Sequence, residues 1–472
     1  MFTDALLGPI EGEFEGAALG DARLMDRLGR MVRALDGAPD HSLASVSKTV
    51  AAREAAYRFV ENRAVTMQGL LAPHREATAA RCREAGMVYV VSDTTEFTFS
   101  GAVRGRALGR IKGKQRGFLG HVALAVGIDR KPLGVLGVET IVRAEQKKTP
   151  RNNFQRKRDP QRESLRWGAM VDSTEDLLEG VNAIHVMDRE ADMFELLSEL
   201  TRRARRFVIR SSQDRSVVQG GKLFDAVSGS PTLLEREVQL SARPNPRVRP
   251  SNGRGHPIRP ARAARLAVSS TQVVIARPKT SDSSYPETLT VNVVRVYETA
   301  PPSGEAPVEW VLFTSEPVGT MEQVGWVVDA YRVRWLIEEY FKALKTGCAY
   351  EQRQMRSLHT LTNTLGILAV IAWRLLLLRA LDRAAPLTPA SDVVAPILLE
   401  ALAARLKHIG EKKIFPLDPT VADVMNGIAR LGGHHKSNGP PGWLLLWSGF
   451  QELLMWSAGF IAGRSVTSCD HS

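Results

Sequence analysis

The sequence predicts a mixed α/β fold with a helical region at each end of the chain. Two short apolar runs, 87–91 and 183–187, are rich in β-branched residues, which is typical of buried strands in an α/β sheet. The chain before about residue 70 and beyond 355 instead shows the apolar spacing of helices. Short alternating segments at about 212–310 predict a β-rich insertion.

Composition narrows the kind of partner. The 472 residues are 44% hydrophobic, enough for a sizeable core spread over two or three domains. Lys and Arg number 63 against 51 Asp and Glu, a formal charge of +12. A basic surface of this size suits a polyanion, either nucleic acid or an anionic membrane.

The three cysteines, Cys82, Cys348 and Cys469, are isolated and odd in number, which argues against a disulfide framework or a structural zinc site. A reducing compartment fits this usage best. The N-terminus is acidic where a secretory signal would be basic, so no signal peptide is expected. The apolar run 365–378 is interrupted by Arg374, which favours a buried core helix over a membrane span.

Residues 1–70 predict two or three short helices. An amphipathic segment at 24–35 carries arginines at helical spacing, and a second basic segment follows the break at 37–40. Such helices could form a platform for a DNA backbone. An ordinary solvated helical bundle has the same composition, and composition alone favours that interpretation.

An acidic residue follows each of the two apolar runs. Asp93 lies just beyond 87–91, and Asp188 directly follows 183–187. In α/β sheets, ligands and metals collect beyond the carboxyl ends of strands, so both aspartates are predicted at such ends. Further strands are expected at 97–99, 120–126, 133–139 and 207–210, helices at 164–178 and 193–203, and basic loops at 101–117 and 145–164.

The insertion contains a strongly positive segment. Eight arginines lie between Arg236 and Arg265, around a Pro/Arg/Gly stretch at 243–262. This arm could bind phosphates or could be solvated sequence without a partner.

The segment 331–345 contains no Gly or Pro and predicts one helix. At about 100° per residue, Tyr331, Arg334, Glu338 and Lys345 fall within roughly 60° of one another. They could form an ion-paired helix face. The rest of the helix is largely apolar, however, and a metal-binding glutamate beside a row of phosphate-binding side chains would have the same pattern. The segment alone leaves both interpretations open.

The three acidic residues together suggest a chemistry. Asp93, Asp188 and Glu338 would converge on a pair of divalent cations roughly 4 Å apart, which can activate a water or a 3′-hydroxyl and stabilise the leaving oxygen of a phosphodiester. All-oxygen ligands suit Mg²⁺, with two ions per site, and Mn²⁺ is expected to substitute. His185 is expected to be a packed strand histidine, because alternation puts it on the opposite face from Asp188.

The types and spacing of these residues resemble those of a known protein family. The spacing Tyr331-x2-Arg334-x3-Glu338-x6-Lys345 is similar to the signature of the bacterial DDE transposases of insertion-sequence family four. The residues around this motif resemble those of the transposon-five transposase branch. The likeness extends along nearly the whole chain, through matching segments at 19–21, 55–59, 93–95, 188–192, 206–210, 312–318 and 428–433.

The resemblance implies an RNase-H-like catalytic core with a β-rich insertion. It implies cut-and-paste transposition, in which water attacks at the transposon end, a DNA hairpin forms and reopens, and the 3′-hydroxyl joins target DNA. Asp93, Asp188 and Glu338 match the metal-binding triad, and Tyr331, Arg334 and Lys345 match residues that contact phosphates.

Two further residues match by position. Trp310 matches a tryptophan that stacks on a base flipped from the DNA end, and stacking would offset an unpairing cost of about a few kcal/mol. A buried strand aromatic is the alternative for Trp310. Arg210 matches an arginine near the transposon end.

The resemblance also implies an organisation and partners. Residues 1–70 would read the terminal inverted repeats, 71–370 would form the catalytic domain, and 371–472 would pair two protomers in a synaptic complex. The partners would be double-stranded transposon ends and target DNA, with no membrane, in a bacterial cytoplasm at the nucleoid. A structure-specific nuclease on the same core and a domesticated, non-catalytic DNA-binding protein are the alternative functions.

Overall fold

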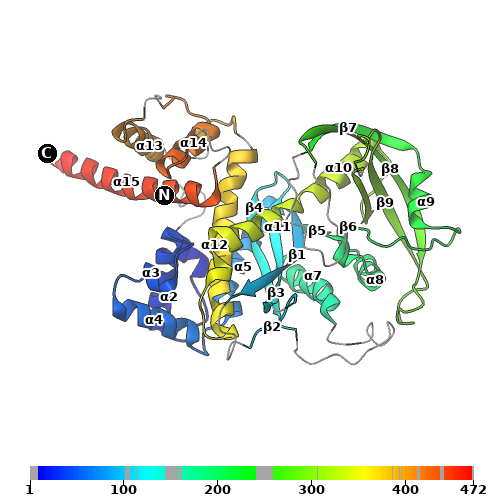
Figure 1. The fold of residues 1–472 in the computed structure, drawn as a ribbon, viewed down its shortest axis with the longest axis horizontal. Helices are drawn as coiled ribbons and strands as arrows, with labels where there is room; N and C mark the ends of the chain where they lie inside the picture. The colour runs from blue at the N-terminus through cyan, green and yellow to red at the C-terminus, as the bar shows by residue number, and fades with distance from the viewer. Residues whose placement is uncertain are drawn as a thin grey trace.

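The computed structural model describes residues 9–100, 107–113, 115–143, 159, 162–240, 259–305, 307–384, 386–392, 394, 396–411, 415–435 and 441–469. Most of the basic loop predicted at 145–164 and of the arm at 243–262 lies outside these ranges, as does part of the loop at 101–117. The described chain has a mixed α/β architecture, with one large sheet and helical regions before and after it (Figure 1).

Ten strands among the described residues form a single sheet in the order β2-β3-β1-β5-β6-β10-β9-β8-β7, with β4 also paired to β3. β1 pairs in parallel with β5, and β5 with β6, whereas the other pairs are antiparallel. The strands are β1 (Met87–Phe99), β2 (Gly109–Arg110), β3 (Arg116–Gly127), β4 (Pro132–Ile141), β5 (Asn182–Met187), β6 (Arg206–Arg210), β7 (Thr232–Leu240), β8 (Arg262–Ala276), β9 (Thr288–Glu298) and β10 (Glu309–Thr314).

The β-rich character predicted for 212–310 is confirmed, since β7, β8 and β9 lie within it. These strands do not form a separate sheet. β9 pairs with β10 and β10 with β6, so the insertion lengthens the sheet that contains β1 and β5 (Figure 1).

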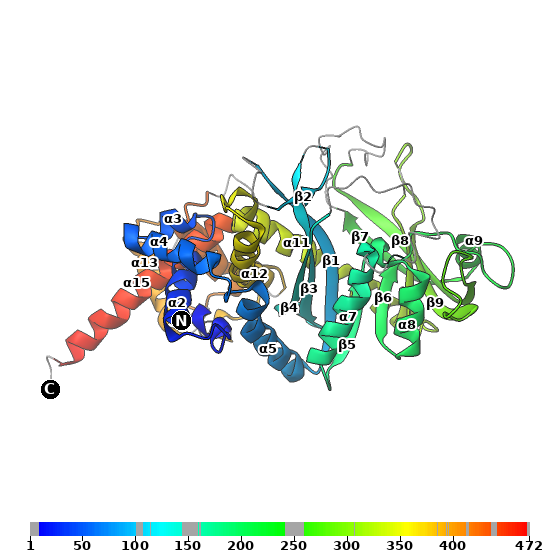
Figure 2. The same cartoon turned by 90° about the horizontal axis from the view of Figure 1, so that it is seen from below.

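Alternation along β1 shows that helices cover both faces of the sheet. Tyr89 and Val91 pack into the cluster formed with α10 (Met321–Arg332), α11 (Trp335–Lys342) and α12 (Leu358–Ala384). Val88 and Val90 face the other way, toward residues of α5 (Met67–Ala85) and α7 (Arg166–Leu177). Farther along that second face lie α8 (Phe194–Arg202) and α9 (Leu223–Ser228) (Figure 2). The side chains of successive β1 residues therefore point to opposite faces of the sheet.

The N-terminal region is helical as predicted, with η1 (Ile10–Phe14), α2 (Ala22–Gly37), α3 (Leu43–Val46) and α4 (Val50–Glu61). A side-chain oxygen caps the start of each α-helix here and of α5, because it accepts a hydrogen bond from a backbone N–H of the first turn. The capping residues are Asp21, Ser42, Thr49 and Thr66.

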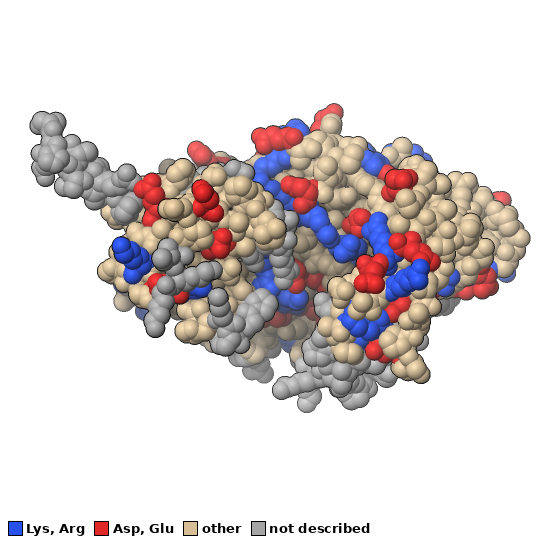
Figure 3. All heavy atoms as spheres, turned by 90° about the horizontal axis from the view of Figure 1, so that it is seen from above, with Lys and Arg blue, Asp and Glu red and all other residues tan. Residues whose placement is uncertain are grey.

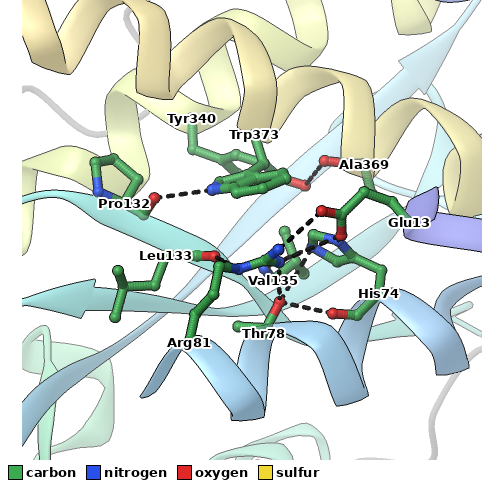
Figure 4. Close-up of polar contacts among 10 residues, drawn as sticks. All are labelled: Glu13, His74, Thr78, Arg81, Pro132, Leu133, Val135, Tyr340, Ala369 and Trp373. Carbon is green, nitrogen blue, oxygen red and sulfur yellow. Dashed lines mark hydrogen bonds and ion pairs between the residues drawn. The ribbon is translucent and has the colours of Figure 1, made fainter. Parts of the chain in front are cut away.

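A buried polar cluster fastens η1 to the sheet (Figure 4). The Glu13 carboxylate lies 2.5 Å from His74 Nδ1 and accepts a hydrogen bond of 2.8 Å from Arg81. The Val135 N–H donates to His74 Nε2 at 3.0 Å, so His74 carries its proton on Nδ1 and is neutral. Burial lowers the pKa of His74. Burial alone would raise the pKa of Glu13, but its hydrogen-bond donors lower it to about 2.

The prediction of a buried core helix at 365–378 is confirmed. By length and composition α12 is the one helix in the described parts of the chain that could cross a membrane, yet 94% of its apolar window is buried inside the protein. It packs against α2, α4, α5, β4 and α11. The predicted boundary after residue 370 falls inside this continuous helix.

The C-terminal region contains α13 (Pro396–His408), α14 (Val421–Leu431) and α15 (Trp443–Cys469), which pack on one another. Trp447 and Phe450, on the first half of α15, are buried in the main core. The Trp447 indole N–H donates to the Asp36 carbonyl of α2, which joins the two ends of the chain. Farther along, Glu452 and Trp456 of α15 contact Arg405 and His408 of α13, and the C-terminal turns of α15 then project away from the rest of the molecule (Figures 1 and 2).

Positive side chains do not cover the surface evenly. On the face shown in Figure 3, lysines and arginines gather in the middle, between the part that carries α13–α15 and the part that carries β7–β9. Acidic side chains are interspersed among them. The net charge of +12 is therefore not expressed there as one uniform basic patch.

Candidate active site

Asp93 and Asp188 lie side by side on adjacent parallel strands. The register pairs Ser92 of β1 with Met187 of β5, and each aspartate is the next residue along the chain. Both follow the alternation onto the face covered by α10–α12. The structure thus brings together two of the predicted acidic residues, which are 95 positions apart in the printed sequence.

The prediction that both aspartates lie at strand ends is correct only for Asp188, which directly follows β5. Asp93 is inside β1, which continues as far as Phe99. The polar residues around Asp93 stay extended because β3 pairs with β1 over its whole length, and Asp93 is opposite Val122. Phe97 and Phe99 bury their rings beyond the polar stretch and hold the end of the strand in the core.

Arg334 joins Asp93 to Glu338. Its Nη1 donates to Asp93 Oδ2 at 3.0 Å, and its Nη2 donates to Glu338 Oε1 at 2.6 Å. The arginine side chain is only 9% exposed, whereas Glu338 is 37% exposed. One guanidinium therefore lies between two of the three carboxylates predicted to bind metal.

The segment 331–345 is not the single helix predicted. α10 ends at Arg332, and the backbone tightens to i−3 hydrogen bonds through Val333 and Arg334 before α11 begins. From Ala343 to Gly347 the chain then widens into a π-helix. These changes in winding alter the angular spacing on which the shared face depended. Arg334 and Glu338 both lie at the start of α11 and still share one face of the helix.

The charges around Asp93 shift its protonation. Burial, together with the neighbouring Asp188, raises the pKa of Asp93 to about 7, although Arg334 opposes the shift. Burial alone would lower the pKa of Arg334, but Tyr331, Glu338 and Asp93 raise it, so this arginine remains charged. The two aspartates are therefore close enough to repel, and a cation placed between them would relieve the repulsion.

Three further predicted residues lie beside this group. Tyr331 is buried, and burial raises the pKa of its hydroxyl, while Arg334 and Arg210 oppose the shift and Asp188 adds to it. The Trp310 ring meets the Tyr331 ring nearly edge-on, with 5.7 Å between centroids. Arg210, at the end of β6, also donates to the Glu309 carbonyl at 3.4 Å.

Lys345 lies apart from the others. Its Nζ donates to the Glu96 carbonyl at 2.6 Å, three residues beyond Asp93 on β1. It lines a groove of about 1060 Å³, together with Thr94, Lys112 and Arg166. Burial lowers the pKa of Lys345, although Glu351 and Glu96 oppose the shift.

The donor atoms fit a hard divalent cation, but they are not assembled around one. Asp93, Asp188 and Glu338 offer only carboxylate oxygens, the ligand type that Mg²⁺ prefers. Within the described ranges, no three His, Cys, Asp or Glu side chains are grouped closely enough to hold a metal ion. Arg334 stands between Asp93 and Glu338, so these carboxylates could share a metal only after its guanidinium moves away.

Asp192 was not among the predicted site residues, and its side chain is completely buried. Its carboxylate accepts hydrogen bonds from the backbone N–H groups of Ser212 and Gln213 and from the Arg215 guanidinium. These contacts fix the segment that follows Arg210. The short spacing from Asp188 to Asp192 was visible in the sequence, but the segment to which Asp192 binds was not.

His185 is placed as predicted, on the face opposite Asp188. It is fully buried, and its Nε2 lies 2.7 Å from Glu175 of α7. It therefore belongs to the packing of the second face of the sheet and not to the carboxylate group.

Comparison with known proteins gives two family matches. Residues 10–65 match a model described as a transposase DNA-binding domain, and this range contains η1 and α2–α4. Residues 137–374, just over half of the chain, match a model described as a transposase DDE domain. The second range includes Asp188 and Glu338 but begins after Asp93.

One similar solved structure is described as a cryo-EM structure of piggyBac transposase synaptic complex with hairpin DNA. The similarity has a TM-score of 0.38 at 10% sequence identity and covers 79% of this chain and 74% of that chain. It is too distant to support an argument about function.

Proposed function

This chain belongs to the DDE transposase family, and we propose that it moves DNA by a cut-and-paste reaction at metal-dependent sites built from Asp93, Asp188 and Glu338. The observation that carries this proposal is the arrangement of the three carboxylates. Two lie on adjacent parallel strands, and the third is linked to the first through Arg334. We also propose that the core is RNase-H-like, as the resemblance implies.

The metal ions would be held by these three side chains, with Mg²⁺ as the natural ion and Mn²⁺ as a substitute. Two such ions, when bound, would activate the attacking oxygen and stabilise the leaving oxygen of the phosphodiester. The raised pKa of Asp93 supports this assignment, because burial and the neighbouring Asp188 raise it, as is typical of carboxylates at functional sites.

Arg334 and Tyr331 would hold DNA phosphates beside the reacting bond. The Arg334 Nε is buried and has no hydrogen-bond acceptor among the described residues. A phosphate oxygen would supply one, and a charge-assisted bond to phosphate is stronger than a neutral one. Drawing Arg334 toward DNA would also free Asp93 and Glu338 for metal. Lys345 would contact a phosphate farther along the groove.

Trp310 and Arg210 would act at the transposon end. Trp310 is only partly buried and lies against Tyr331, and its exposed part would stack on a flipped base. Stacking there would stabilise the unpaired base by about 1–3 kcal/mol. This would favour the sharply bent DNA of a hairpin step.

We further propose that the segment 10–65 reads the terminal inverted repeats and that α15 pairs two protomers in a synaptic complex, acting on the nucleoid of a bacterial cytoplasm. The family match over 10–65 supports the first part. The projecting end of α15 supports the second, since a helix that leaves the body of the molecule can reach another copy (Figure 2).

The test uses full-length protein, a cleaved transposon end and a supercoiled plasmid, with Mg²⁺ present. A transposase joins the end to the plasmid, whereas a structure-specific nuclease on the same core only cuts. A non-catalytic DNA-binding protein does neither. Glu338→Gln should reduce cleavage by at least about 100-fold, because a lost metal ligand removes several kcal/mol of transition-state stabilisation. Unchanged cleavage by this variant would show that the carboxylate assignment is wrong.

A further inference from the structure

Arg166 contacts β1, which carries Asp93, and the turn after β5, which begins at Asp188, from the opposite face of the sheet. It is the first residue of α7, and its side chain is only 8% exposed. Its Nε donates to Thr94 Oγ1 at 2.9 Å, and its Nη2 donates to Glu190 Oε2 at 2.5 Å. Its Nη1 donates to the Glu163 carbonyl at 2.8 Å. Three acceptors therefore fix the plane of the guanidinium.

Each side-chain acceptor belongs to a residue that orients one aspartate. The backbone N–H of Thr94 donates to Asp93 Oδ1 at 2.7 Å. The backbone N–H of Glu190 donates to Asp188 Oδ1, also at 2.7 Å. The Arg166 guanidinium thus binds the side chains of the two residues whose backbone N–H groups orient the Asp93 and Asp188 carboxylates.

We propose that Arg166 is a positioning residue that sets the separation and direction of the Asp93 and Asp188 carboxylates. This inference rests on the proposed function of those two residues as metal ligands. Arg166 ties the middle of β1 to the turn after β5, where no strand-to-strand hydrogen bond continues beyond Ser92 and Met187 in the described pairing. Without it, two like charges on neighbouring strands would be free to separate.

The surroundings of Thr94 favour such a role. His121 is fully buried, and its Nδ1 lies 2.9 Å from Thr94 Oγ1, so this hydroxyl is held on two sides. The His121 ring in turn rests against Trp167, the residue after Arg166, with 4.7 Å between ring centroids. Packing behind Thr94 therefore gives Arg166 a fixed point on β1, from which it can hold the turn that contains Glu190.

A purely stabilising ion pair does not account for this arrangement. Glu190 is 60% exposed, and ion pairs with a solvated partner contribute little to stability. An arginine also presents several donors in a rigid plane, which lysine does not. A geometric role predicts that Arg166→Lys keeps the charge but loses the connection between the two strands.

The direct experiment measures Mn²⁺ binding to the full-length protein on transposon-end DNA, by electron paramagnetic resonance. For Arg166→Gln we expect the Mn²⁺ dissociation constant to rise about 10- to 100-fold, the usual effect of removing a residue that orients a metal ligand. Arg166→Lys should also weaken binding. DNA affinity without divalent metal should stay within twofold, because Arg166 is occupied by protein acceptors. A variant that loses DNA and Mn²⁺ affinity together would identify Arg166 as a DNA contact and overturn the proposal.

Arg143→Gln is the matched control, since Arg143 lines the same groove but donates to the Glu163 carboxylate, whereas Arg166 donates to Thr94 and Glu190. It should leave Mn²⁺ affinity unchanged. Thr94→Val removes only the acceptor on β1 and should reproduce part of the Arg166→Gln effect, while Thr94→Ser should restore it. This pair keeps the test informative if Arg166→Gln folds poorly.

The variant Asp188→Asn distinguishes a failure of the positioning role of Arg166 from a failure of the proposed metal site. If Asp188→Asn abolishes Mn²⁺ binding and the Arg166 and Thr94 variants do not weaken it, the positioning role is wrong and the proposed metal site stands. If Asp188→Asn binds Mn²⁺ like the unmodified protein, the proposed metal site itself is wrong.

Discussion

Arg334 donates a hydrogen bond of 3.0 Å to Asp93, although 241 positions separate the two residues in the chain. The same guanidinium reaches Glu338 at 2.6 Å. A positive charge thus already occupies the space between two carboxylates that are proposed to bind metal. Under the proposed function Arg334 and a metal ion would compete for these oxygens, and DNA phosphate would decide the competition by drawing the arginine away.

We predict that Arg334→Met binds Mn²⁺ more tightly than the unmodified protein when DNA is absent. The gain should be at least about tenfold, because removing a cation within hydrogen-bond distance of two carboxylates is worth about 1.4 kcal/mol or more. Calorimetric titration of the DNA-free protein measures the change. Arg332→Met is the control, since exposed Arg332 pairs with Asp329 and not with the triad. Equal or weaker Mn²⁺ binding by Arg334→Met would contradict the competition.

The raised pKa of Asp93 predicts a pH-dependent cost in stability. Its pKa is raised from 3.8 to about 7, so between these values the folded protein keeps a proton that the unfolded chain releases. Stability therefore falls as pH rises through this window. Asp93→Asn has no such titration. Its melting temperature should exceed that of the unmodified protein by more at pH 8 than at pH 5, in metal-free buffer. A gap independent of pH would contradict the shift.

Trp310→Ala should slow hairpin formation more than the first nick. Base stacking is worth about 1–3 kcal/mol, so the hairpin step should slow roughly 5- to 100-fold while nicking changes little. Time courses on denaturing gels, with an end-labelled transposon end, separate the two products. Trp310→Phe keeps a stacking face and serves as the control. Equal effects of Trp310→Ala on both steps would remove the base-flipping role.

Glu13→Gln should loosen the N-terminal region from the core. Glu13 is 4% exposed and pairs with Arg81, and breaking a buried pair typically costs about 3–5 kcal/mol. The pKa of Glu13 is lowered to about 2, so its contribution is present above about pH 4.5 and is lost as pH falls toward 2. Limited proteolysis should cut the segment 10–65 faster in this variant.

Glu11→Gln is the matched control for that measurement. Glu11 lies on the same short helix but pairs with Arg33, whose side chain is 60% exposed. Its loss should change the melting temperature little, as expected for a solvated ion pair. Similar proteolysis of both variants would show that the buried cluster does not anchor the N-terminal region.

Local patterns in the sequence were sufficient to predict many of the helices and strands. The β-branched runs at 87–91 and 183–187 predicted the strands that became β1 and β5, because burial on both faces demands continuous apolar residues. Spacing alone also placed Arg334 four residues before Glu338, where an ion pair forms. Spacing did not predict how the helix winds. The tight turn at Arg334 and the π-helix around Lys345 lie where the segment packs against β1 and α12.

The sequence by itself determined which residues are proposed to carry the chemistry: an acidic residue after each apolar run, a third on a largely apolar helix, and the basic and aromatic residues around it. These are local properties, set by residue type and spacing. Only the tertiary structure decided that Asp93 and Asp188 stand in register, that Arg334 lies between Asp93 and Glu338, and that Arg166 holds Thr94 from 72 positions away. Such contacts form when strands pair and helices cover the sheet, and no short stretch of sequence contains both partners.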